Sequence, residues 1–96
     1  MPAGYVIADI EVKDPEAYTD YRGLSTAAAE KHGGEFLVRG GATETLEGAW
    51  QPSRFVIIRF ESVEAARRWY ESPEYSEARA VRQRAAESTL LLAEGI

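Results

Sequence analysis

The sequence predicts a single α+β domain over residues 1–96, with elements in the order strand, helix, strand, strand, helix, strand. Two observations lead to this prediction. Apolar residues alternate with polar ones in several short stretches, as in half-buried strands, and recur at helical spacing in the stretches between them. Residues that cap helices stand where each helical stretch begins. This order is that of the split βαβ, or ferredoxin-like, arrangement.

The ferredoxin-like order predicts a four-stranded antiparallel sheet with both helices packed on one of its faces. The first and third strands are expected to be neighbours at the centre of the sheet. Right-handed crossover connections are expected to make these two strands parallel. A chain of 96 residues has room for one such domain.

The first half of the chain supplies two strands and one helix. Residues 4–12, "GYVIADIEV", alternate and are predicted to form the first strand. Asp14 is expected to cap the following helix, which should end at Gly33. Residues 35–41, "EFLVRGG", are predicted to form the second strand. Its glycine pair favours a bulge or bend, after which the strand is expected to resume through "TETLEG".

The second half is predicted to form a strand, a broken helix and a last strand. Residues 54–60, "RFVIIRF", alternate as the third strand, and Ser62 is expected to cap the second helix. Proline disfavours helical torsions in the residue before it. The second helix is therefore expected to break at Ser72-Pro73, where Ser72 caps the continuation. "TLLLAEG", residues 89–95, is predicted to close the sheet.

The broken helix carries a possible anion site. After the break, one arc of the helix holds Tyr75, Arg79 and Arg82, beside an apolar stripe that packs. A tyrosine and two arginines on one arc are suited to holding an anion at the edge of the sheet. The alternative is structural, with arginines placed near the helix C-terminus and paired with acids such as Glu74. Trp69 lies off the predicted core stripe of its helix, where it either lines a cleft or covers the sheet edge.

The two faces of the sheet differ in polarity. The face expected to carry the helices is purely apolar, with Val6, Ala8, Ile10, Phe36, Val38, Val56 and Ile58. The opposite face combines Tyr5, Ile7, Leu37, Phe55 and Ile57 with Asp9, Glu11, Arg39 and Arg59. Contiguous apolar surface of this kind usually marks an interaction site. We therefore expect a homodimer in which two sheets stack into a shared α/β barrel.

Composition excludes several classes of function. A net charge of −5 opposes binding to nucleic acid, and no apolar run approaches the length of a membrane span. The chain has no cysteine and one histidine, and its glycine pairs match no dinucleotide or phosphate-binding motif. No metal site and no cofactor are therefore expected. The acidic N-terminal stretch is unlike a signal peptide, so a cytoplasmic protein is expected.

Two residues are candidates for proton transfer. Asp9 faces the predicted barrel interior, where apolar neighbours would raise its pKa and suit it as a base. The alternative is an ion pair with Arg39 or Arg59. His32, the only histidine, stands at the predicted C-terminus of a helix, where a purely structural role is also sufficient.

Several motifs closely resemble the bacterial domain-of-unknown-function family thirteen-thirty. They are "DPEAYTDYR", "HGGEFLVRGG", "LEGAWQPSRFVIIRF", "EAARRWYESPEY" and "ARAVRQRAAES", and together they cover nearly the whole chain. The resemblance implies a subunit of the dimeric α/β-barrel superfamily, which includes monooxygenases, isomerases and ligand-sensing domains. It carries over no activity. The family's recurring polar and aromatic positions correspond to Arg39, Gly40, Gly41, Trp50, Trp69, Tyr70, Tyr75 and Arg79.

Two functions remain open at this point. The first is a module or small enzyme that handles an aromatic or carboxylate metabolite, as in cofactor-independent oxygenation or isomerisation. Arg39 and Arg79 would hold the anion, Trp69 and Tyr75 would flank it, and Asp9 or His32 would move a proton. The second is a non-catalytic dimer module whose barrel interior is only core. The substitution Arg79→Ala should abolish ligand binding in the first and affect only stability in the second.

Overall fold

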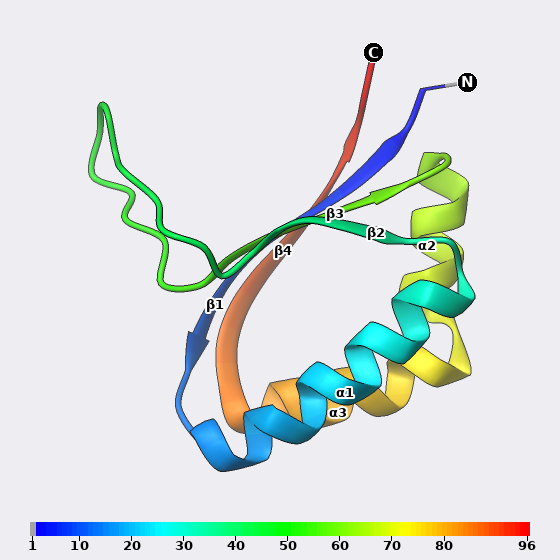
Figure 1. The fold of residues 1–96 in the computed structure, drawn as a ribbon, viewed down its shortest axis with the longest axis horizontal. Coiled ribbons are helices and arrows are strands. Elements are labelled where there is room, and N and C mark those ends of the chain that lie inside the picture. Colours follow the sequence, from blue (N-terminus) through cyan, green and yellow to red (C-terminus); the bar gives the residue numbers. More distant parts are fainter. Residues whose placement is uncertain (1) are drawn as a thin grey trace.

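The computed structural model describes residues 2–96. Four strands and three helices follow the predicted order, with the second helical stretch divided in two (Figure 1). Their bounds are β1 Gly4–Val12, α1 Pro15–Lys31, β2 Glu35–Arg39, β3 Phe55–Phe60, α2 Val63–Glu71, α3 Pro73–Ala85 and β4 Ala86–Glu94. The helices lie on one side of the sheet, which confirms the predicted ferredoxin-like architecture.

The sheet has the order β2-β3-β1-β4, so β1 and β3 are the central neighbours, as predicted. The prediction that they run parallel is wrong, because β1 pairs with β3 in an antiparallel register that joins Ile7 to Ile57. The crossover through α1 makes β2 parallel to β1, and β3 then reverses direction to pair with β2. β4 pairs antiparallel with the other side of β1 and forms one edge of the sheet.

An irregularity in β2 exchanges the faces of two side chains. Phe36 pairs with Ile58, but Val38 pairs with Ile57 and Arg39 with Val56, so the register shifts between Phe36 and Val38. Residues paired across antiparallel strands share a face of the sheet. Val38 therefore lies on the open face and Arg39 on the helix face, which reverses the predicted placement of both residues.

The predicted resumption of the second strand is also wrong. Residues 40–54 form no helix or strand, and we call this segment the arm. Figure 1 shows the arm extending away from the sheet on the side opposite the helices. Residues 40–51 are all exposed, with Leu46 at 85% of its maximum accessible surface. No strand within residues 2–96 pairs with this segment, although its sequence favours a strand.

Side-chain caps start all three helices as predicted. Asp14 Oδ1 accepts a hydrogen bond from Ala17 N at 3.2 Å, and Ser62 Oγ accepts one from Ala65 N at 3.1 Å. Ser72 Oγ accepts from Tyr75 N at 3.1 Å. The predicted break at Ser72-Pro73 is confirmed, because Ser72 has extended torsions and caps α3.

The core lies between the helices and the sheet, and aromatic residues occupy its centre. The largest fully buried side chains are Trp69, Tyr75 and Phe60. Trp69 was predicted to lie off the core stripe, yet it is 1% exposed, whereas Tyr70 is only partly buried. α2 therefore turns Trp69 inward, and α3 turns Tyr75 inward beside it. No helix within residues 2–96 is long and apolar enough to span a membrane.

Candidate functional site

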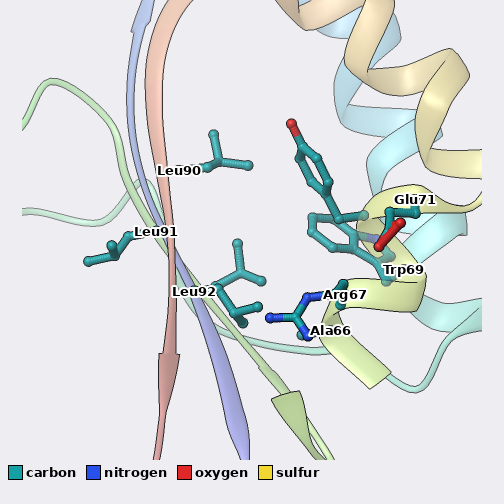
Figure 2. A pocket seen from close by; sticks show the side chains of 9 residues that line it. Ala66, Arg67, Trp69, Glu71, Leu90, Leu91 and Leu92 are labelled. Carbon is teal, nitrogen blue, oxygen red and sulfur yellow. The ribbon is translucent and has the colours of Figure 1, made fainter. Parts of the chain in front are cut away.

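A groove with an aromatic wall lies between the edge strand β4 and helix α2 and has a volume of about 470 Å³. Figure 2 shows Leu90 and Leu92 facing Trp69 and Arg67 across this groove, while Leu91 points the other way. Its lining comprises Val6, Ala66, Arg67, Trp69, Tyr70, Glu71, Leu90, Leu91 and Leu92. We call this surface the edge groove.

Strand alternation builds one wall of the edge groove. Leu90 pairs with Ala8 and Leu92 with Val6, whose side chains are buried on the helix face. Leu91 pairs with Ile7 on the open face and is 59% exposed. Successive residues of a strand point to opposite faces, so only alternate leucines of "TLLLAE" reach the groove.

Helix periodicity and aromatic packing build the other wall. The Trp69 ring lies 4.0 Å from the Tyr75 ring and 6.3 Å from the Tyr70 ring, measured between centroids. The guanidinium carbon of Arg79 lies 4.7 Å from the centroid of Tyr70, in a cation–π contact. Arg79 therefore orients a ring of the groove wall without lining the groove itself. Trp69 Nε1 is buried and has no hydrogen-bond partner within the described residues.

The rim of the edge groove carries opposite charges. Arg67 and Glu71 stand one helical turn apart on α2, and both line the groove. The ion pairs within residues 2–96 are Lys13–Glu11, Lys31–Glu74 and His32–Glu74, so Arg67 pairs with no carboxylate there. An arginine without such a partner is well suited to a bidentate contact with a carboxylate.

Three of the four predicted ligand residues meet at a second, interior cavity between the helices and the sheet. Arg39, Trp69 and Tyr75 all line it, but its volume of about 20 Å³ holds only about one water molecule. Arg39 Nη2 donates to Arg22 O at 3.3 Å and to Thr26 Oγ1, so it ties β2 to α1. Burial, followed by repulsion from nearby arginines, lowers the pKa of Arg39.

Tyr75 belongs to a buried phenol pair. Its hydroxyl lies 2.8 Å from the hydroxyl of Tyr21. Burial, together with the neighbouring Tyr21, raises the pKa of Tyr75, which keeps the phenol neutral. Arg82, 5% exposed, lies beside this pair and donates to Ser88 Oγ. Tyr75 and Arg82 thus lie inside the helix layer, and the predicted anion arc of α3 does not form on the surface.

Asp9 anchors the arm, and the ion pair with Arg39 or Arg59, the structural alternative for this residue, does not form. Its carboxylate accepts a hydrogen bond from Trp50 Nε1 at 2.8 Å and one from Ser53 N at 2.9 Å. The Trp50 ring also packs edge-on against Phe55, with centroids 5.7 Å apart. Asp9 lines neither the edge groove nor the interior cavity.

We expect Asp9→Ala to release the base of the arm. Both hydrogen bonds to Asp9 are exposed, so the free energy of unfolding should fall by no more than about 1 kcal/mol. Amide exchange in residues 42–53 should become faster, and the emission of Trp50 should shift to longer wavelength. Hydrogen-exchange mass spectrometry measures the first effect. Unchanged exchange in the arm would contradict an anchoring role.

His32 takes a structural position at the end of α1. Its backbone N–H donates to Ala28 O and Ala29 O, and its Nε2 lies 3.7 Å from Glu74 Oε1. Lys31 Nζ lies 2.6 Å from the same oxygen, and this contact lowers the pKa of Glu74. His32 lines neither cavity. Within residues 2–96, no three histidine, aspartate or glutamate side chains gather as metal ligands do.

The structure thus brings Trp69 and Tyr75 into contact and stacks Arg79 on the ring of Tyr70. The other predicted site residues do not line the edge groove: Arg39, Asp9 and His32. Sequence reasoning missed Arg67 as a rim residue. Its spacing of four from Glu71 was a weak signal, because exposed charges at that spacing are common on helices.

The fold and the groove define a ferredoxin-like α+β protein with an open cleft at the edge of its sheet. The chain belongs to the family described as "Domain of unknown function (DUF1330)", which matches residues 3–96. No curated protein matches it.

Solved structures share the fold. A protein of unknown function from Rhodopseudomonas palustris is 23% identical, with a TM-score of 0.78, over 99% of this chain and 83% of that one. SnoaB, a cofactor-independent oxygenase from Streptomyces nogalater, is 15% identical, with a TM-score of 0.67, over 97% and 92%. A dimeric ferredoxin-like protein of unknown function from Thermobifida fusca is also 15% identical, with a TM-score of 0.59, over 97% and 91%.

Proposed function

We propose that this protein binds a small aromatic carboxylate in the edge groove, without a tightly bound cofactor. The observation that carries the proposal is the combination of an aromatic and leucine-lined groove with an arginine on its rim that pairs with no carboxylate within residues 2–96. Sites for small molecules commonly measure about 300–1,000 Å³ and combine apolar walls with a few polar groups. The edge groove, at about 470 Å³, has both properties.

The groove suggests how such a ligand lies. Its ring packs between Trp69 and Tyr70 on one side and Leu90 and Leu92 on the other, where it loses contact with water. Its carboxylate receives hydrogen bonds from Arg67. Glu71, on the same rim, accepts a hydrogen bond from a hydroxyl group of the ligand.

Binding is better supported than proton abstraction. The two candidates for proton transfer, Asp9 and His32, lie outside the groove, and each has a structural role. One protein with this fold is described as a cofactor-independent oxygenase. Fold does not fix function, so oxygen consumption is best measured alongside binding.

The test is calorimetric titration with 4-hydroxybenzoate as the probe. We expect Arg67→Ala to weaken binding by about tenfold or more, because a hydrogen bond to a charged group contributes about 1.5–3 kcal/mol. Arg68→Ala is the matched control: Arg68 is exposed on the same helix but does not line the groove.

Two further variants separate the alternatives. Arg79→Ala should weaken binding less than Arg67→Ala, since Arg79 acts through the ring of Tyr70. Arg39→Ala should leave binding unchanged, since Arg39 lies at the interior cavity. If Arg67→Ala and Arg68→Ala lose the same affinity for 4-hydroxybenzoate, the edge groove is not the binding site. If the wild type does not bind 4-hydroxybenzoate, the proposal is refuted.

We also propose a homodimer through the open face of the sheet. That face carries Tyr5, Ile7, Val38, Phe55 and Ile57, with Leu91 at 59% exposure. Contiguous apolar surface of this kind usually marks an interface. A structure with this fold from Thermobifida fusca is described as dimeric, which supports a dimer. The alternative function, a non-catalytic dimer module, rests on this face alone and requires no ligand.

A further inference from the structure

The arm contains a stretch whose sequence favours a strand but which forms none. Its residues 43–46, Thr-Glu-Thr-Leu, combine β-branched residues with an apolar one, a composition that favours an extended, paired strand. Instead they are irregular and exposed, and Leu46 has 85% of its surface in water. The arm extends away from the body of its own subunit (Figure 1). Leu46 is therefore free to pack against another molecule.

Strand β4 pairs with β1 on one side only, and no strand within residues 2–96 pairs with its outer side. It lies at one end of the sheet order, so the outer backbone groups of its nine residues, Ala86–Glu94, face away from β1. Such an edge is a template for an added strand, and proteins usually cover it. The edge groove opens directly beside this edge, with Leu90 and Leu92 lining it (Figure 2).

We propose that the arm of a second copy adds to the edge of β4 and closes the open side of the edge groove. The proposal rests on the homodimer and on the ligand groove proposed above, and it adds the partner's Leu46 to that groove. Side chains two residues apart in a strand share a face. When Leu46 points into the groove beside Leu90 and Leu92, Glu44 points to the same side and Thr45 to the other.

Charge is consistent with this pairing. The arm contributes Glu44, on the same side as Leu46, while the middle of α2 presents Arg68 next to Arg67, the residue assigned to the ligand. Glu71, also on the rim, opposes the arm carboxylates and limits how far along the groove the arm can sit. The attraction therefore favours an arm placed nearer the middle of α2 than its end at Glu71.

The absence of cysteine from the chain allows a direct test by disulfide trapping. Leu46→Cys, carrying a mass tag, is co-expressed with Leu90→Cys or with Leu92→Cys. We use both β4 variants because Leu46 can face either Leu90 or Leu92. A second variant also serves if one substitution disturbs folding, which circular dichroism detects. The control partner is Ala27→Cys, exposed on α1. We expect mixed disulfides with one or both β4 variants and none with the control.

A second readout follows binding of 4-hydroxybenzoate. Leu46→Ser should weaken the binding of 4-hydroxybenzoate by about tenfold while the dimer persists, because the groove loses an apolar wall. Thr45→Ser, on the opposite side of the arm, should leave it unchanged. A wild type that sediments as a monomer overturns the homodimer and this proposal together. A dimer without mixed disulfides, or with only Leu46→Cys self-pairs, overturns the arm placement and leaves the dimer and the ligand groove standing.

Discussion

Replacing Trp69 with alanine is expected to lower the free energy of unfolding by about 3–5 kcal/mol. The Trp69 side chain is 1% exposed, and its ring packs 4.0 Å from Tyr75 and 5.2 Å from Phe60, measured between centroids. Its removal leaves a cavity among rings that cannot all move inward. Domains of this size are stable by about 5–15 kcal/mol, so the loss is a large part of the total. Urea denaturation followed by circular dichroism measures it.

Trp50→Ala is the matched control for this prediction. Trp50 is 58% exposed on the arm, where it donates a hydrogen bond to Asp9 and packs against Phe55. Its replacement should cost about 1 kcal/mol or less. If the two variants unfold at the same urea concentration, Trp69 is not the centre of the core, and the proposed wall of the edge groove fails with it.

Ile57→Glu is expected to convert the proposed dimer into a monomer. Ile57 lies at the centre of the open face, between Ile7 on β1 and Val38 on β2. In a stacked pair of sheets this position is closed to water, and a carboxylate buried there without a partner costs several kcal/mol. We therefore expect the dimer dissociation constant to rise by more than about 100-fold. Sedimentation velocity at micromolar concentration measures the change.

The control for Ile57→Glu is Ala27→Glu, which adds the same charge at an exposed position of α1, on the helix side. It should leave the sedimentation coefficient unchanged. Far-ultraviolet circular dichroism must show that Ile57→Glu remains folded. A folded Ile57→Glu protein that still sediments as a wild-type dimer would show that the subunits associate through another surface.

Local physical chemistry explains why the fold was largely predictable. Asp14, Ser62 and Ser72 each satisfy backbone N–H groups within three residues, so the helix starts depend on the sequence around them and little else. Proline at position 73 enforces the break between α2 and α3 in the same local way. Alternation in β1 and β3 determined which residues are buried, since Val6, Ala8, Val56 and Ile58 lie in the core as expected.

The candidate site was less predictable, because it depends on contacts between distant segments. The register shift in β2 sends Arg39 to the helix face, and no local pattern announces it. The stripe predicted for α2 left Trp69 aside, yet the aromatic contacts with Phe60 and Tyr75 draw Trp69 into the core. The arm stays irregular because residues 41–53 make no backbone–backbone hydrogen bonds with the other described residues.

The sequence by itself determined the order of elements, their caps and the apolar face on which the helices pack, because those features depend on neighbours a few residues apart. Only the tertiary structure decided that Arg67 stands opposite Leu90 and Leu92, that Asp9 holds the arm, and that Arg79 stacks on Tyr70. Those contacts join residues from different elements. Their geometry follows from strand order, register and helix rotation, which packing of the whole chain sets at once.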